Sequence, residues 1–265
     1  MASIAGQKRE GRIGLIGGTG GGHLDLGGAA PEPVETPWGE AMVTRGSLQG
    51  QEVFSVLRHG REHSVPPHKV NYRANIAALA QLGVERVFAI NACGGLSERV
   101  CPGDVVIVDQ FLDFTKCRPL TFFDGDGDPV IHVDLTEPYC PSLRRRLRDA
   151  TAATKMNLHS TGTYVACEGP RYESAAEIRM YRTLGGDVIG MTGVPELVLA
   201  REIGLCYSAL CLITNNAAGI GEAARLRHSD VESVMERCSE MVAWIVGEAI
   251  ARSGDDPACE HCRAE

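Results

Sequence analysis

GTYVACEGPRYESAAEIRMYRTLGGDVIGMTGVPE, residues 162–196, decides the fold because its patterns predict strand, loop, helix, strand and loop in turn. The apolar run Gly162–Cys167 predicts a buried strand, which Gly169-Pro170 interrupts because neither residue continues a ladder well. A polar start and an apolar helical face then predict a helix that Gly185-Gly186 ends. Asp187–Met191 predicts a second short strand.

Two loops of this stretch are expected to form one ligand-binding cleft. In an open α/β sheet, ligands bind beyond the carboxyl ends of the strands. Residues Glu168–Glu173 follow the first strand and Met191–Thr192 end the second. A binding site is therefore predicted where these two loops meet.

The remaining patterns predict a single α/β domain with a central mixed, twisted β-sheet flanked by helices. With 265 residues, of which 44% are hydrophobic, the chain suits one large domain better than two small ones. Residues 1–11 are predicted to be a flexible N-terminus, 12–251 the domain and 252–265 a disordered tail. Strands are predicted at Arg12–Ile16, Glu35–Arg45, Gln51–Leu57, Arg86–Asn91, Pro102–Asp109 and Leu205–Thr214, and helices at Val70–Leu82, Leu143–Ala153 and Asp230–Ile250.

Charge and hydropathy argue against two classes of partner. A formal net charge of −8 argues against nucleic-acid binding, which needs clustered Lys and Arg. The longest basic cluster, Arg144–Arg148, is interpreted as the solvated face of a helix. No segment approaches the roughly 18 apolar residues of a membrane span, and the polar N-terminus lacks the apolar core of a signal peptide. We therefore expect a cytoplasmic protein with no nucleic-acid or membrane partner.

The ten cysteines fit a reducing compartment, since eight of them lie singly in apolar or mixed stretches. Cys259 and Cys262 are the exceptions, with His261 between them in a polar tail. This C-x-x-C could be half of a zinc site or a redox pair, but no second ligand pair at zinc spacing occurs in the sequence. The pattern therefore favours a disordered tail without a metal site.

A glycine-rich segment, GGTGGGH at residues 17–23, follows the first predicted strand. It is similar to a dinucleotide-binding loop, but the acidic residue expected downstream is missing and prolines interrupt the unit. A phosphate-binding turn is the better interpretation, in which backbone N–H groups and the Thr19 hydroxyl surround an anion. The segment alone would also fit a surface turn.

Six ordered motifs resemble those of the trimeric nucleoside phosphorylases, a family that includes 6-oxopurine nucleoside phosphorylases and methylthioadenosine phosphorylases. One motif pairs EGPRYES with GMTGVPE, and the others are IGGTG at 16–20, RHGREH at 58–63, HKVNYRANI at 68–76, NACGGL at 91–96 and LITNNAAG at 212–219. The resemblance covers residues 12–247 and implies the nucleoside phosphorylase-like α/β fold and a homotrimer.

The resemblance implies a role for each motif residue. Phosphate would bind Thr19, Arg58, His59, Ala92 and Thr192, where an Arg fork and an imidazole suit a tetrahedral oxyanion. The nucleoside would bind Asn91, Cys93, Gly94, Tyr172, Glu173, Met191, Asn215, Ala217 and His228, with His63 near the sugar. In this set Tyr172 would stack on the base and Met191 would pack beneath the ribose. A residue near His132 would reach the neighbouring subunit's site.

Two residues at the base end are expected to select the purine. A 6-oxopurine presents an N1–H donor and an O6 acceptor, whereas a 6-aminopurine presents an N1 acceptor and an N6 donor. Glu173 would accept N1–H, and the Asn215 amide would donate to O6 and N7. Methylthioadenosine phosphorylases typically carry the residues S-S at the first of these positions and T-D-x-D at the second, and this chain has neither. The HKVNYRANI and DQFLDFT segments of this chain nevertheless look closer to the methylthioadenosine branch. We base the predicted substrate on Glu173 and Asn215 rather than on the similarity of the other segments, because a buried acceptor facing an acceptor rejects a ligand strongly.

The 5′ end of the sugar depends on His228. This residue matches a His that 6-oxopurine nucleoside phosphorylases place against the 5′-hydroxyl, where methylthio-specific relatives carry an apolar residue. The match crosses a loop of variable length, so a helix-capping role is the alternative.

The sequence thus predicts phosphate-dependent cleavage of inosine and guanosine to the free purine and ribose 1-phosphate. Asn215, Glu173 and His59 are the predicted catalytic residues. No cofactor or metal is expected, because phosphate is a co-substrate. The alternatives are an S-methyl-5′-thioinosine or S-methyl-5′-thioadenosine phosphorylase, a non-catalytic nucleoside-binding protein and an NAD-dependent dehydrogenase. Absence of phosphate dependence would favour either of the last two.

Overall fold

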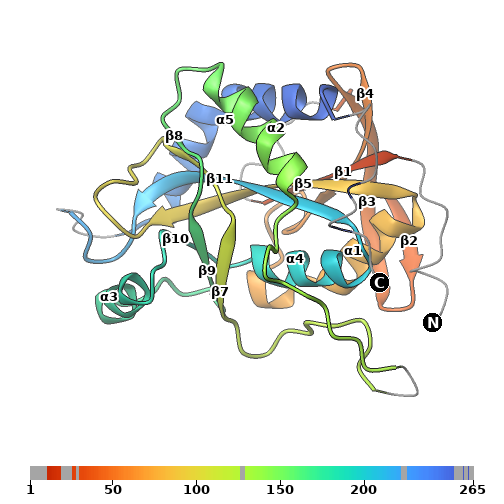
Figure 1. Cartoon of the computed structure of the whole chain (residues 1–265), viewed down its shortest axis with the longest axis horizontal. Helices are drawn as coiled ribbons and strands as arrows, with labels where there is room; N and C mark the ends of the chain where they lie inside the picture. Colours follow the sequence, from red (N-terminus) through yellow and green to blue (C-terminus); the bar gives the residue numbers. More distant parts are fainter. Residues whose placement is uncertain are drawn as a thin grey trace.

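The computed structural model describes residues 11–18, 26–27, 30–125, 129–221, 226–253, 259 and 262. This part of the chain forms one mixed sheet with helices on both faces, as predicted (Figure 1). The strands are β1 (Arg12–Gly17), β2 (Glu32–Thr36), β3 (Gly39–Leu48), β4 (Gln51–Leu57), β5 (Val84–Gly95), β6 (Val105–Ile107), β7 (Gln110–Phe114), β8 (Leu158–His159), β9 (Thr163–Cys167), β10 (Val188–Gly190) and β11 (Cys206–Asn216). The helices are α1 (Tyr72–Gln81), α2 (Pro141–Ala152), α3 (Ala175–Thr183), α4 (Gly193–Glu202) and α5 (His228–Ala251), and a 3₁₀ turn spans Pro67–Lys69.

The centre of the sheet is parallel and its edges are mixed. Strand β1 lies between β4 and β5, and β11 pairs with β5 from Arg86 to Gly95, all in parallel. The carboxyl ends of these four strands therefore lie at one edge of the sheet. Strands β9 and β10 pair in parallel with each other, and β10 runs antiparallel to the last residues of β5, with Val188 opposite Gly95. This pairing brings the ends of β9 and β10 to the end of β5.

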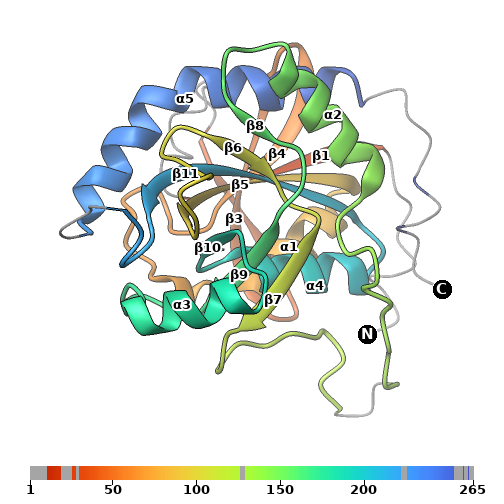
Figure 2. The ribbon, with the colours of Figure 1, turned by 60° about the vertical axis from the view of Figure 1, so that its left-hand side comes forward.

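Two helical layers cover the sheet. Helices α1 and α4 pack on one face, and α2 and α5 pack on the other (Figures 1 and 2). Strand β11 is the apolar strand predicted to be central, and it lies between β5 and β6 with its residues from Cys206 to Thr214 buried. None of the described helices is long and apolar enough to cross a membrane.

Helix α4 corrects the sequence prediction, which gave a loop after Thr192. Nine of its ten residues are buried, from Gly193 to Glu202 with Val198 half-buried. An amphipathic stripe is the signal that identifies a helix in sequence, and a helix buried on all sides has none.

Two further predictions were wrong in detail. The strand predicted at Glu35–Arg45 is two strands, β2 and β3, because Pro37 and Trp38 form a turn and Gly39 adopts a φ of 108°. The basic cluster is not wholly solvated, since Arg144 is buried and lies 3.5 Å from Asp109. The predicted flexible N-terminus falls outside the described residues except for Gly11, and so does most of the tail.

Candidate functional site

A cavity of about 520 Å³ lies where the four parallel strands end. Its walls come from the ends of β1, β4, β5 and β11, from the loops after β9 and β10, and from the start of α5. Pro170, Tyr172 and Glu173 reach it from one loop, and Met191 and Thr192 reach it from the other. The predicted meeting of these two loops is therefore confirmed.

Most of the sequence-predicted site residues line this one cavity: Arg58, His59, His63, Asn91, Ala92, Cys93, Gly94, Tyr172, Glu173, Met191, Thr192, Asn215, Ala217 and His228. Thr19 lies outside the described residues, although its neighbour Gly18 lines the cavity. His132 is exposed on the segment between β7 and α2 and does not line the cavity. Its reach into a neighbouring subunit stays a prediction.

The two cavity loops are fastened together by Arg118, which the sequence analysis did not single out. Its guanidinium donates to the carbonyl oxygens of Cys167, the last residue of β9, and of Glu168 on the loop that follows, and to that of Met191 on the other loop. It also donates to the Tyr72 hydroxyl at 3.1 Å. Arg118 is only 8% exposed, so these bonds are shielded from water. The one available signal was its position in an unusually long loop.

Arg58 lines the cavity but is already paired with Glu196 on α4. The two side chains are fully buried and form two hydrogen bonds, of which Nη2 to Oε1 measures 2.8 Å. Nη1 donates to the Ile90 carbonyl at 2.8 Å, and the Tyr207 hydroxyl donates to Glu196. Burial alone would lower the pKa of Arg58, but the charge of Glu196 more than offsets this and keeps the pKa above its ordinary value.

This pairing sets what Arg58 can offer a ligand. Within the described part of the chain it uses three of the five guanidinium N–H groups, which leaves two donors for an oxyanion. Because Glu196 cancels its charge, Arg58 acts there as an aligned donor more than as a net cation. Glu196 was missed as a site residue, although it ends the GMTGVPE motif.

Three histidines form a row along one wall. The ring centroids of His59 and His63 lie 4.6 Å apart, and those of His63 and His228 lie 5.3 Å apart. Burial lowers the pKa of His59 to about 4, so its ring is neutral at neutral pH. Nδ1 lies 2.7 Å from the Val65 carbonyl oxygen and must donate to it, so Nε2 carries the lone pair. His59 can therefore accept a proton or a hydrogen bond from a ligand O–H.

The opposite end of the cavity presents a carboxylate and an amide. Glu173 precedes α3, whose N-terminus is fixed by a capping box between Ser174 and Glu177. Burial removes water from the Glu173 carboxylate and so raises its pKa, and a carboxylate in this setting is stabilised by a hydrogen-bond donor. Asn215 Nδ2 donates to the Asn216 carbonyl at 3.0 Å, and its second N–H has no partner among the described residues.

Gly94 leaves room for the side chain of Asn215. A Cβ at this position would lie 3.2 Å from Asn215 Nδ2 and 3.1 Å from the Ile189 side chain. The glycine thus lets the amide sit against the end of β5, where the chain also offers its backbone to a ligand.

His228 is the first residue of α5 and lines the cavity. Its Nδ1 lies 3.5 Å from the Tyr172 hydroxyl, and its Nε2 lies 3.6 Å from Glu232. The N-cap residue is Arg227, which makes no side-chain capping bond. The placement therefore favours a pocket role for His228 over helix capping.

Comparison with known proteins gives consistent matches over nearly the whole chain. Residues 12–251 match the model of the Phosphorylase superfamily. A 6-oxopurine nucleoside phosphorylase of Pyrococcus furiosus is 48% identical over 244 residues, which cover 90% of this chain and 92% of that protein. A probable S-methyl-5′-thioinosine phosphorylase of Methanopyrus kandleri is 45% identical, with 87% and 92% covered. The structure of methylthioadenosine phosphorylase from Schistosoma mansoni in complex with adenine is similar with a TM-score of 0.89 at 31% identity, covering 95% of this chain and 94% of that one.

Proposed function

Because the chain belongs to the Phosphorylase superfamily, we propose that it is a purine nucleoside phosphorylase that acts on 6-oxopurine nucleosides such as inosine and guanosine. Inorganic phosphate attacks the anomeric carbon, the N-glycosidic bond breaks, and the products are the free purine and ribose 1-phosphate. The observation that carries the choice of base is the pair formed by Glu173 and Asn215 at one end of the cavity.

At the base end, the two side chains match the edge of a 6-oxopurine. The Glu173 carboxylate accepts N1–H, and the free N–H of Asn215 donates toward O6 and N7. Burial of Glu173 makes this match selective, since a poorly solvated carboxylate facing the N1 acceptor of adenine has no donor to replace water. Negative charge builds on the purine as it leaves, so the Asn215 bond strengthens in the transition state.

At the other end, Arg58, His59 and Thr192 surround the space for phosphate. Arg58 supplies two N–H donors in a fixed orientation, held by Glu196. The neutral His59 accepts from the O–H of the phosphate monoanion or dianion. The bound phosphate is both the nucleophile and the counter-charge to the oxocarbenium-like sugar. Because it is already held beside the anomeric carbon before the reaction, the entropic part of the activation barrier is lower.

A second candidate is an S-methyl-5′-thioinosine phosphorylase, which the relative of that name at 45% identity favours. It shares the 6-oxopurine base, so it differs only at the 5′ end of the sugar. His228 and His63 make that end polar, which supports a 5′-hydroxyl over an alkylthio group.

The remaining parts of the proposal concern the setting of the reaction. The enzyme acts in purine salvage in the cytoplasm, and none of its ten cysteines forms a disulfide, which supports a reducing compartment. It needs no cofactor, because phosphate is consumed as a co-substrate. It works as a homotrimer, in which the exposed His132 segment lies against a neighbour. Sedimentation of the purified chain tests the trimer.

One activity panel tests the function. Release of base from inosine, guanosine, adenosine, methylthioadenosine and methylthioinosine is measured with and without phosphate. The proposal expects phosphate-dependent release from inosine and guanosine above all others. Equal release without phosphate would identify a hydrolase, and preference for methylthioinosine would establish the second candidate.

A further inference from the structure

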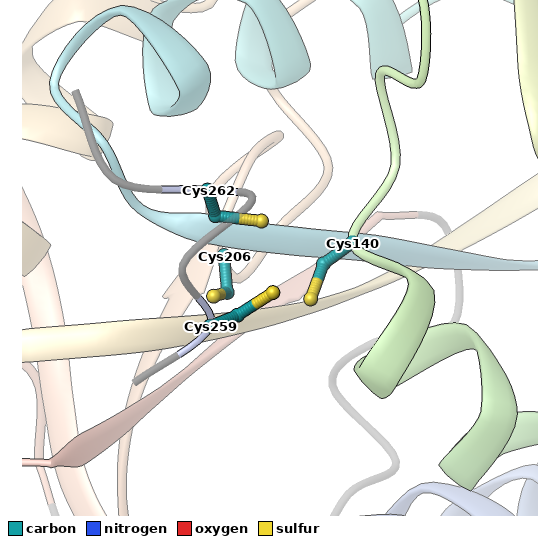
Figure 3. A group of neighbouring side chains, drawn as sticks. All are labelled: Cys140, Cys206, Cys259 and Cys262. Carbon is teal, nitrogen blue, oxygen red and sulfur yellow. The ribbon is translucent and has the colours of Figure 1, made fainter. Parts of the chain in front are cut away.

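Four cysteines from three distant parts of the chain converge at one point, far from the cavity. They are Cys140 before α2, Cys206 at the start of β11, and Cys259 and Cys262 of the C-terminal tail (Figure 3). All four sulfur atoms lie within 4.8 Å of one another. For Cys259 and Cys262 the structure contradicts the predicted disordered tail, since Cys262 is 1% exposed and both pack against the core beneath α2 and α5.

We propose that these four cysteines form a structural zinc site that fastens the C-terminal tail to the body of the domain. A tetrahedral Zn²⁺ with Zn–S bonds of about 2.3 Å places its ligand sulfurs about 3.8 Å apart. The observed sulfurs, all within 4.8 Å, need only a small contraction to reach that geometry. Four thiolates close the coordination shell, which is typical of structural sites and leaves no open position for catalysis.

The backbone around the cluster is arranged for this geometry. The N–H of Cys262 donates to the Cys259 carbonyl at 3.1 Å, which holds these two cysteines close together. The N–H of Cys140 donates to the Tyr207 carbonyl at 2.8 Å, which holds Cys140 beside the strand that carries Cys206. Cys140 is also the N-cap residue of α2, so the start of that helix fixes its position.

Convergence of all four sulfurs favours a metal over two disulfides. A disulfide needs only two sulfurs to approach, whereas here every sulfur lies near the other three. The site is also remote from the chemistry. Cys206 and Asn215 lie near opposite ends of β11, which at roughly 3.3 Å per residue puts them about 30 Å apart. Zinc here stabilises the fold and takes no part in the reaction.

The test is the metal content of the full chain, purified without a metal-binding tag from zinc-supplemented cells. We expect about one zinc per chain in the wild type. A Cys259→Ser, Cys262→Ser double variant should contain at least ten-fold less zinc per chain than the wild type. The control variant Cys238→Ser changes a half-buried cysteine on α5 outside the cluster and should keep the wild-type zinc content. A chelator should lower the thermal midpoint of the wild type and of the Cys238 variant but leave the double variant unchanged.

A second measurement holds even if the double variant folds poorly. Titration of the metal-free, reduced wild type with Co²⁺ should give the thiolate charge-transfer band and the tetrahedral ligand-field bands of a four-sulfur site, saturating at one equivalent. Two results would overturn the proposal. One is a metal-free wild type whose intact mass lacks four hydrogens relative to the reduced chain, which identifies two disulfides. The other is zinc content that the double variant retains in full.

Discussion

Replacing Glu196 with Gln tests how Arg58 is held in the cavity wall. The substitution keeps the shape of the side chain but removes its charge, and it puts an amide N–H group against a guanidinium N–H donor. Glu196 is 0% exposed and receives two hydrogen bonds from Arg58 and one from the Tyr207 hydroxyl. Removing one partner of a buried pair typically costs 3–5 kcal/mol, because the other charge stays buried without compensation.

The expected result is a fall in the thermal midpoint. For a domain near this size, each kcal/mol corresponds to roughly 2–4 °C, so Glu196→Gln should lower the midpoint by roughly 6–20 °C. A matched control is Glu248→Gln, which breaks the exposed pair with Arg252 and should cost less than about 1 kcal/mol. Differential scanning fluorimetry or calorimetry gives both values.

Phosphate adds a second, independent readout to this variant. In Glu196→Gln the buried Arg58 has no counter-charge, so a bound phosphate dianion would supply one. Phosphate should therefore raise the midpoint of Glu196→Gln by more than it raises that of the wild type. The reasoning is refuted if the variant is as stable as Glu248→Gln, or if phosphate stabilises it no more than it stabilises the wild type.

Three further predictions address single residues of the cavity. Asn215→Ala should lower kcat with inosine by roughly 10²–10³ with a smaller change in KM, because the bond to N7 strengthens as the base leaves; equal losses in binding and turnover would contradict this. His228→Val should weaken kcat/KM for inosine by roughly 1–3 kcal/mol while sparing or improving methylthioinosine, and an unchanged ratio of the two substrates would place His228 outside the reaction. Burial lowers the pKa of His59 to about 4, so the unfolded chain binds a proton at this residue more tightly than the folded protein does. The free energy of unfolding should therefore fall as the pH drops from about 6.5 toward 4. His59→Gln should remove up to roughly 3 kcal/mol of that pH dependence in denaturant titrations, and identical slopes would show that His59 is not buried as a neutral ring.

The part of the stretch from residue 162 to residue 191 was predictable because its signals are local. An apolar run, the break at Gly169-Pro170 and the polar start at Glu173-Ser174 identify β9 and α3 without reference to the rest of the chain. The cavity residues followed from the motifs, since every motif except HKVNYRANI lies at the end of a strand of the sheet.

The parts that the sequence did not reveal depend on contacts between distant residues. Arg58 and Glu196 are 138 positions apart, and only the packing of α4 on the sheet brings them together. The hydrogen bonds of Arg118 join two loops that are each more than forty positions away from it. The four-cysteine cluster escaped detection for the same reason, because Cys140 and Cys206 carry no ligand spacing of their own.

The most direct test of the account is the wild-type ratio of kcat/KM for inosine to that for adenosine at saturating phosphate. Glu173 and Asn215 meet adenine with two mismatched contacts, so the ratio should be on the order of 10⁴. A ratio near one would mean that Glu173 and Asn215 do not select the base, and the proposed specificity would be wrong.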